Sequence, residues 1–286
     1  MSLEKLYEFL HWPMCPDEES ARRRFERIRQ VFTNLIEKCV IERKKEISIL
    51  DLAAGTGIAG VALSKALSDE GVKVELTAVD LREKDLHFIN EWIRAYEAKN
   101  IRANTVVADI RELHRYFEES RYDIAILWGL TMPHFDPFDT VKIFANASYI
   151  LKEDGIFLME ESDRVFNILY RTGYKDFLVE TKTEDYTLIS VHEGYNLKRG
   201  MFKRTYYKLP DFEKIAEEEH RLWDIAGILG IGSVFFKDYN VVTKAQHGIL
   251  GVSDVLIFKN PRKIYRLTNF WRVKNVCKTI QKARRF

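Results

Sequence analysis

Residues 47–60 read Ile-Ser-Ile-Leu-Asp-Leu-Ala-Ala-Gly-Thr-Gly-Ile-Ala-Gly, an apolar run that ends in three closely spaced glycines. The apolar run predicts a buried strand, and Gly55, Gly57 and Gly60 have the spacing of a glycine turn between a strand and a helix. Such a turn lets backbone N–H groups approach a ligand closely. The stretch therefore predicts a cofactor-binding loop, of a kind that several nucleoside cofactors share.

Asp51, four positions before Gly55, separates these cofactors. A pyrophosphate site at a helix N-terminus is tuned for an anion, so a neighbouring carboxylate disfavours NAD or FAD. S-adenosylmethionine has no phosphate and carries a sulfonium and an ammonium group. A carboxylate beside these positive charges is tolerated or favourable. With Asp51 included, the stretch resembles the cofactor loop of class I S-adenosylmethionine-dependent methyltransferases. We therefore expect S-adenosyl-L-methionine as the cofactor.

Two further acids follow the next strands of the sequence. Asp80 ends the second predicted strand, where a carboxylate can accept both ribose hydroxyls, although it can also cap a helix. Asp109 follows the third strand, and the resemblance implies that it accepts the adenine amino group; an N-cap role is compatible with this. The expected cofactor-binding residues are Asp51, Ala53, Gly55, Gly57, Asp80, Leu81, Asp109, Ile110 and Trp128.

Apolar strands and amphipathic helices alternate up to Glu160, which predicts an α/β fold with a doubly wound, mostly parallel sheet. β-prone segments then predict an antiparallel β insertion after the fifth strand, at about 173–209. A helix over 212–229 and strands at 233–242 and 251–258 would complete a seven-stranded Rossmann-like sheet. The predicted domains are an N-terminal helical lid (1–45), the methyltransferase domain (46–258) and a basic helical tail (259–286). The other predicted strands are 47–52, 74–80, 105–108, 123–128 and 155–160. The other predicted helices are 16–38, one that follows the glycine turn and ends at 67, 83–98, 110–117 and 140–151.

The segment after the fourth strand, 128–135, is expected to lie beside the transferred methyl group. It lacks the Asn/Asp-Pro-Pro-aromatic motif of enzymes that methylate amino groups of DNA or glutamine, and the Pro-Cys motif of cytosine-C5 enzymes. It resembles more closely the corresponding segment of small-molecule methyltransferases. His134 is the candidate general base, because imidazole titrates near neutral pH; a structural histidine is the alternative. Methyl transfer can also proceed by positioning alone, since the sulfonium is already a strong electrophile.

The predicted insertion would cover the crevice and supply the acceptor pocket. Carboxylates and aromatic rings around a reacting centre suit an amine or a cationic product, whereas aromatic pairs on an ordinary sheet face are the alternative. The candidate acceptor-binding residues are Glu161, His192, Tyr195 and Arg204.

Charge is unevenly distributed along the chain of 286 residues. Ten of the 45 basic residues lie in 259–286 with no acid among them, leaving 35 basic against 43 acidic residues elsewhere. This tail can bind nucleic acid or dock on the body as an amphipathic helix. No apolar run is long enough for a membrane span, and the mixed, acid-containing composition of residues 1–10 does not predict a secretory signal. The three cysteines are widely spaced, so we expect reduced thiols, no metal site and a cytoplasmic location.

Together these features predict a methyltransferase that modifies nitrogen or oxygen of a small-molecule acceptor. The alternatives are an RNA or protein methyltransferase that docks through the basic tail, a non-catalytic cofactor-binding interaction protein, and a nicotinamide oxidoreductase. The sequence does not determine the oligomeric state.

Overall fold

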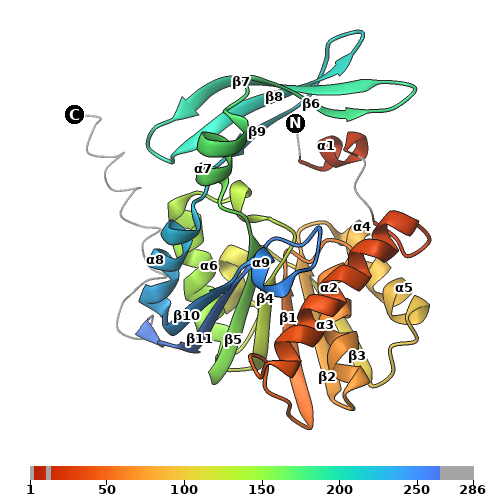
Figure 1. Ribbon diagram of the computed structural model, residues 1–286, viewed down its shortest axis with the longest axis vertical. Coiled ribbons are helices and arrows are strands. Elements are labelled where there is room, and N and C mark those ends of the chain that lie inside the picture. The colour runs from red at the N-terminus through yellow and green to blue at the C-terminus, as the bar shows by residue number, and fades with distance from the viewer. Residues whose placement is uncertain (1–2, 11–13, 265–286) are drawn as a thin grey trace.

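The computed structural model describes residues 3–10 and 14–264 and is built on a seven-stranded sheet (Figure 1). The strand order is β10-β11-β5-β4-β1-β2-β3; β11 runs antiparallel to both of its neighbours, and the remaining pairs are parallel. The predicted doubly wound sheet with a reversed final hairpin is therefore confirmed. Its strands are β1 (Glu46–Leu52), β2 (Lys73–Asp80), β3 (Ile101–Val107), β4 (Tyr122–Leu127), β5 (Leu151–Glu161), β10 (Phe236–Val242) and β11 (Asp254–Pro261).

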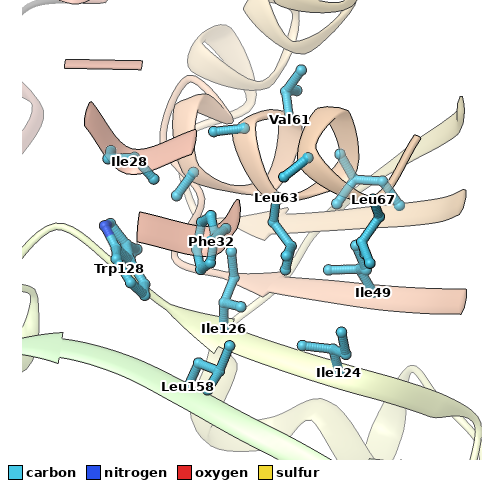
Figure 2. Close-up of a cluster of buried hydrophobic side chains, with 14 of the residues drawn as sticks. Ile28, Phe32, Ile49, Val61, Leu63, Leu67, Ile124, Ile126, Trp128 and Leu158 are labelled. Atoms are coloured by element: carbon cyan, nitrogen blue, oxygen red, sulfur yellow. The ribbon is translucent and has the colours of Figure 1, made fainter. Parts of the chain in front are cut away.

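Helices cover both faces of this sheet because its strands alternate apolar side chains between two cores. On β4, Ile124 and Ile126 join one core and Leu127 joins the other. The first core, part of which Figure 2 shows, contains buried residues of α2 (Glu19–Glu37), α3 (Ile58–Asp69) and α5 (Phe88–Ala95). The second contains α6 (Pro137–Ile150), α8 (Ile225–Phe235) and the short helix η1 (Ile110–Arg115). Short helices elsewhere are α4 (Glu83–Leu86), η2 (Met132–His134), α7 (Arg164–Phe166), η3 (Asn167–Thr172) and α9 (Lys244–His247).

A second, four-stranded antiparallel sheet is inserted after β5, as predicted, but it is longer than expected. Its order is β6-β7-β8-β9, with strands β6 (Phe177–Lys182), β7 (Thr187–Asn196), β8 (Met201–Leu209) and β9 (Glu213–His220). The helix predicted over 212–229 is therefore wrong for its first half. The segment is rich in helix-forming Glu and Lys, but pairing with β8 buries Ile215 and Ala216, and this tertiary gain outweighs local propensity.

The predicted N-terminal lid divides into two parts. Helix α2 belongs to the main core, where Phe25 and Phe32 are fully buried. Helix α1 (Leu3–Phe9) instead packs against β9, and Leu6 is buried with Ile215 of the inserted sheet. Figure 1 shows α1 beneath that sheet, away from the body of α2.

The basic tail lies almost wholly outside the described residues, which end at Ile264. Within them, Lys263 Nζ donates to the carbonyl oxygen of Ser148 at 2.7 Å, at the C-terminal end of α6. Among the described residues, no helix combines the length and the apolar character needed to cross a bilayer.

Two glycines with the same backbone conformation give a stability prediction. Gly57 and Gly71 both have φ of +80°, but a Cβ on Gly57 would lie 2.3 Å from Cγ1 of the buried Ile89, whereas one on Gly71 would meet nothing within 4 Å. We expect Gly57→Ala to lower the free energy of unfolding by about 1–3 kcal/mol more than Gly71→Ala, because only Gly57→Ala adds overpacking to the left-handed strain. Urea denaturation of both variants measures this difference; equal losses would contradict it.

Candidate active site

A cavity of about 250 Å³ opens at the carboxyl ends of the parallel strands. This is the edge at which open α/β sheets bind ligands. Helix α1 contributes Tyr7 to its wall, and α2 contributes Arg24 and Ile28. The predicted residues that line it are Asp51, Ala53, Gly55, Asp80, Leu81, Asp109, Ile110, Trp128 and His134.

The glycine loop is shaped around Asp51, which is 1% exposed. Asp51 Oδ2 accepts a hydrogen bond from Gly60 N at 2.9 Å, and a Cβ on Gly60 would lie 2.5 Å from the same oxygen. Burial raises the pKa of Asp51 to about 8, since one backbone hydrogen bond offsets little of the lost hydration. Gly57 does not line the cavity; it is the N-cap of α3 and has a left-handed conformation. A neutral acid in the free protein is therefore ready to ionise beside a cation.

Asp80 holds the loop and the following turn together. Its Oδ2 accepts from Gly55 N at 2.7 Å, and its Oδ1 accepts from Arg82 N at 2.9 Å. Each carboxylate oxygen has a second lone pair, so two ligand hydroxyls can still donate to it. Arg82 in turn lies 4.5 Å from the ring centre of Tyr7 and 2.7 Å from Asp85. The carboxylate is thus rigidly placed at the cavity wall.

Asp109 has the N-cap role that the sequence allowed. Its Oδ1 accepts from Arg111 N at 2.9 Å, and its two oxygens receive the Arg111 side chain at 2.9 and 2.6 Å. Partial burial would raise the pKa of Asp109, but its hydrogen bonds from Arg111 hold that pKa below its usual range. Arg111 also donates to Asp139 at 2.8 Å. Little accepting capacity remains on this carboxylate, so Ile110 and Leu81 are the more available contacts for a flat apolar ring.

A basic group that the sequence did not predict, Arg24, also lines this cavity. Arg24 of α2 is half-buried, and its Nη2 would lie 3.2 Å from a Cβ on Gly129. Glu160 nearby accepts from Gly129 N at 3.1 Å and from Ser253 N at 3.0 Å. Burial raises the pKa of Glu160 and lowers that of Arg24, and each group counteracts the shift of the other. Arg24 lies on a helix that is distant in sequence from the glycine loop. No sequence pattern therefore predicted that Arg24 would line the same cavity as that loop.

His134 lies at the rim of the cavity, on η2, with its side chain 30% exposed. Its Nδ1 is 3.7 Å from Glu218 Oε2, and its ring centre is 5.6 Å from that of His220. Glu218 and His220 come from β9, the strand that was predicted to be helical. The sequence therefore gave no reason to place them beside His134.

The predicted acceptor-binding residues do not gather in one place. Arg204 lines a second cavity of about 550 Å³ under the inserted sheet, but its guanidinium donates to the Ser190 hydroxyl and to three backbone carbonyl oxygens. Glu161 is fully buried and lies 3.3 Å from Arg164. Neither it, His192 nor Tyr195 lines either cavity. His192 is bonded to Tyr174 at 2.7 Å, and Tyr195 is 51% exposed.

This fold and this crevice define a Rossmann-like nucleoside-binding domain, and comparison with known proteins gives its class. Residues 49–155 match the model of a methyltransferase-domain family. The fold of a protein from Pyrococcus horikoshii OT3 is similar, with a TM-score of 0.59 and 18% identity over 91% of this chain and 100% of that chain. A ribosomal protein L11 methyltransferase of Dictyoglomus turgidum is 24% identical over 157 residues.

The chain carries a class I S-adenosylmethionine-dependent methyltransferase domain. The superfamily and the cofactor predicted from the glycine loop and Asp51 are thereby confirmed. The match to the Dictyoglomus turgidum protein covers 52% of this chain and 46% of that protein, so the chain spans about half of its length.

Proposed function

We propose that this protein transfers the methyl group of S-adenosylmethionine to nitrogen or oxygen of a small-molecule acceptor. The observation that carries the proposal is that Asp51, Asp80 and His134 line the same cavity. Asp80 would accept the ribose hydroxyls, and the adenine ring would lie between Leu81 and Ile110. Asp51 and Arg24 would then meet the ammonium and carboxylate of the methionine part, because their charges are complementary to it.

The methyl group would face the rim formed by η2. Transfer requires an acceptor lone pair in line with the S–CH3 bond; the new bond forms as the C–S bond breaks, and sulfur keeps the electron pair. Holding the two reactants in this arrangement can supply an effective molarity of about 10⁵–10⁸ M. His134 is the side chain at the rim that can take a proton from an acceptor N–H or O–H.

A small acceptor is favoured because the crevice is covered. Tyr7 of α1 closes one wall, and Arg221 N of the inserted sheet donates to Pro133 O at 2.8 Å, beside the rim. The second cavity lies on the other side of this junction and is lined by aromatic side chains, including Tyr174 and Phe202. A pocket of this size suits a small, partly apolar molecule.

A protein acceptor is the second candidate, because the curated relative is named for methylation of a ribosomal protein. Formation of S-adenosylhomocysteine by the full chain, with three acceptor sets, separates these proposals. The sets are small amines and hydroxy compounds, ribosomal proteins, and tRNA or rRNA. Turnover with the first set alone is expected. Turnover only with protein or RNA would contradict the small-molecule proposal and favour the alternative, a protein or RNA methyltransferase that docks through the basic tail.

A further inference from the structure

Two histidines and a glutamate meet between the two cavities. His134 lies on η2, and Glu218 and His220 lie on β9; one donor atom from each lies within 4.8 Å of the other two. His134 lines the cofactor cavity, and His220 lines the second cavity. The cluster therefore lies where an acceptor would approach the methyl donor.

Backbone contacts on both sides hold the two segments in register. Arg221 N donates to Pro133 O at 2.8 Å, and Trp223 Nε1 donates to Phe135 O at 3.0 Å. These bonds flank His134 on one segment and follow His220 on the other. These backbone contacts therefore hold the imidazoles of His134 and His220 close to each other.

The carboxylate of Glu218 has a distant ion-pair partner. Its side chain is 9% exposed, and the one ion pair it makes among residues 3–10 and 14–264 is with His134, at 3.7 Å. That distance is too long for a hydrogen bond. The oxygen atoms of Glu218 therefore have lone pairs that a cation between the two segments could take.

We propose that His134, Glu218 and His220 bind one divalent first-row transition-metal ion. Two imidazoles and one carboxylate are a donor set that such ions favour, and they leave coordination positions open. Metal–ligand bonds of about 2.1 Å in tetrahedral geometry place ligand atoms about 3.4 Å apart. Side-chain rotations that move the three donor atoms by about 1 Å would bring them to this spacing. Tyr206 Oη lies 3.0 Å from Nε2 of His220, a contact of the kind that orients a ligating imidazole.

The guanidinium groups near the cluster have partners of their own. Arg164 lies 3.3 Å from Glu161, and Arg204 donates to the carbonyl oxygens of Lys175 and Ser190 at 2.9 and 3.0 Å. They border the second cavity, in which an anionic oxygen of the acceptor would be attracted both to them and to the ion. The open metal positions would thus hold an acceptor oxygen toward the cofactor cavity.

Metal binding and general-base catalysis are competing roles for His134. An imidazole nitrogen that ligates an ion cannot accept a proton, so a metal-loaded protein would activate the acceptor through the ion. The metal proposal stands apart from the methyl-transfer proposal, because metal binding and S-adenosylhomocysteine formation are measured separately.

The test is a titration of the untagged full chain, freed of metal with a chelator, with Zn²⁺ by calorimetry and with Co²⁺ by visible absorption. We expect one ion per chain and the absorption bands of low-symmetry Co²⁺. The variants Glu218→Gln and His220→Ala should raise the Zn²⁺ dissociation constant more than tenfold. Glu218→Gln keeps the side-chain shape, and retained S-adenosylhomocysteine binding by both variants shows that they are folded.

The matched control is His192→Ala, which removes a histidine of the same inserted sheet that lies outside the cluster. It should bind Zn²⁺ like the unmodified chain. Absence of Zn²⁺ heat and Co²⁺ bands in the unmodified chain, or equal dissociation constants in all four proteins, would overturn the proposal.

Discussion

Replacing Asp80 by alanine is expected to weaken binding of S-adenosylhomocysteine more than 100-fold. The carboxylate is 6% exposed, accepts from Gly55 N at 2.7 Å and lines the cavity. Loss of two hydrogen bonds to a charged acceptor costs about 3 kcal/mol, which corresponds to this change in affinity. Calorimetric titration of the variant with S-adenosylhomocysteine measures the effect.

Two further variants show whether the loss belongs to this carboxylate. Asp80→Asn keeps an oxygen for Gly55 N and should lose less affinity, about tenfold. Glu83→Ala removes an exposed acid three residues along the chain and should bind like the unmodified protein. If Asp80→Ala bound S-adenosylhomocysteine as tightly as Glu83→Ala, Asp80 would not be the ribose-binding residue.

The affinity for S-adenosylhomocysteine is expected to rise with pH between 6 and 8, by about 50-fold. Asp51 has a pKa of about 8 in the free protein because it is buried. At pH 6 about one molecule in a hundred carries the charged form, against about half at pH 8. The ammonium of the ligand favours that charged form, so binding near pH 7 should release a proton from Asp51.

Asp51→Asn isolates this contribution from that of Glu160, whose pKa burial also raises. The amide keeps an oxygen for Gly60 N but does not titrate. Calorimetry of S-adenosylhomocysteine binding in buffers of different ionisation enthalpy counts the protons released. We expect close to one for the unmodified chain and none for the variant; equal proton release would show that Asp51 is not the group that ionises.

The glycine loop and the strand-end acids were predictable because both follow from local sequence. Asp51, Asp80 and Asp109 each end or follow a run of apolar residues, and parallel strands bring their carboxyl ends to one edge of a sheet. The cofactor crevice therefore followed from spacing alone. Asp109 shows the limit of such reasoning, since Arg111 occupies most of its accepting capacity.

The acceptor side was not predictable because it depends on tertiary pairing. The Glu-rich segment 213–220 has the composition of a helix and becomes β9 only through its bonds to β8. That error hid Glu218 and His220, which face His134 from this strand. Arg24 escaped notice for a related reason: α2 packs against α3 through its apolar face, and this packing carries the arginine to the cavity.

The most direct test of the central claim is a pair of titrations of the unmodified chain, one with S-adenosylhomocysteine and one with NADH. The account predicts one S-adenosylhomocysteine site per chain and no binding of NADH, because the buried carboxyl group of Asp51 already accepts from Gly60 N at the start of α3, where a pyrophosphate would need free backbone N–H groups. Binding of NADH without binding of S-adenosylhomocysteine would contradict it.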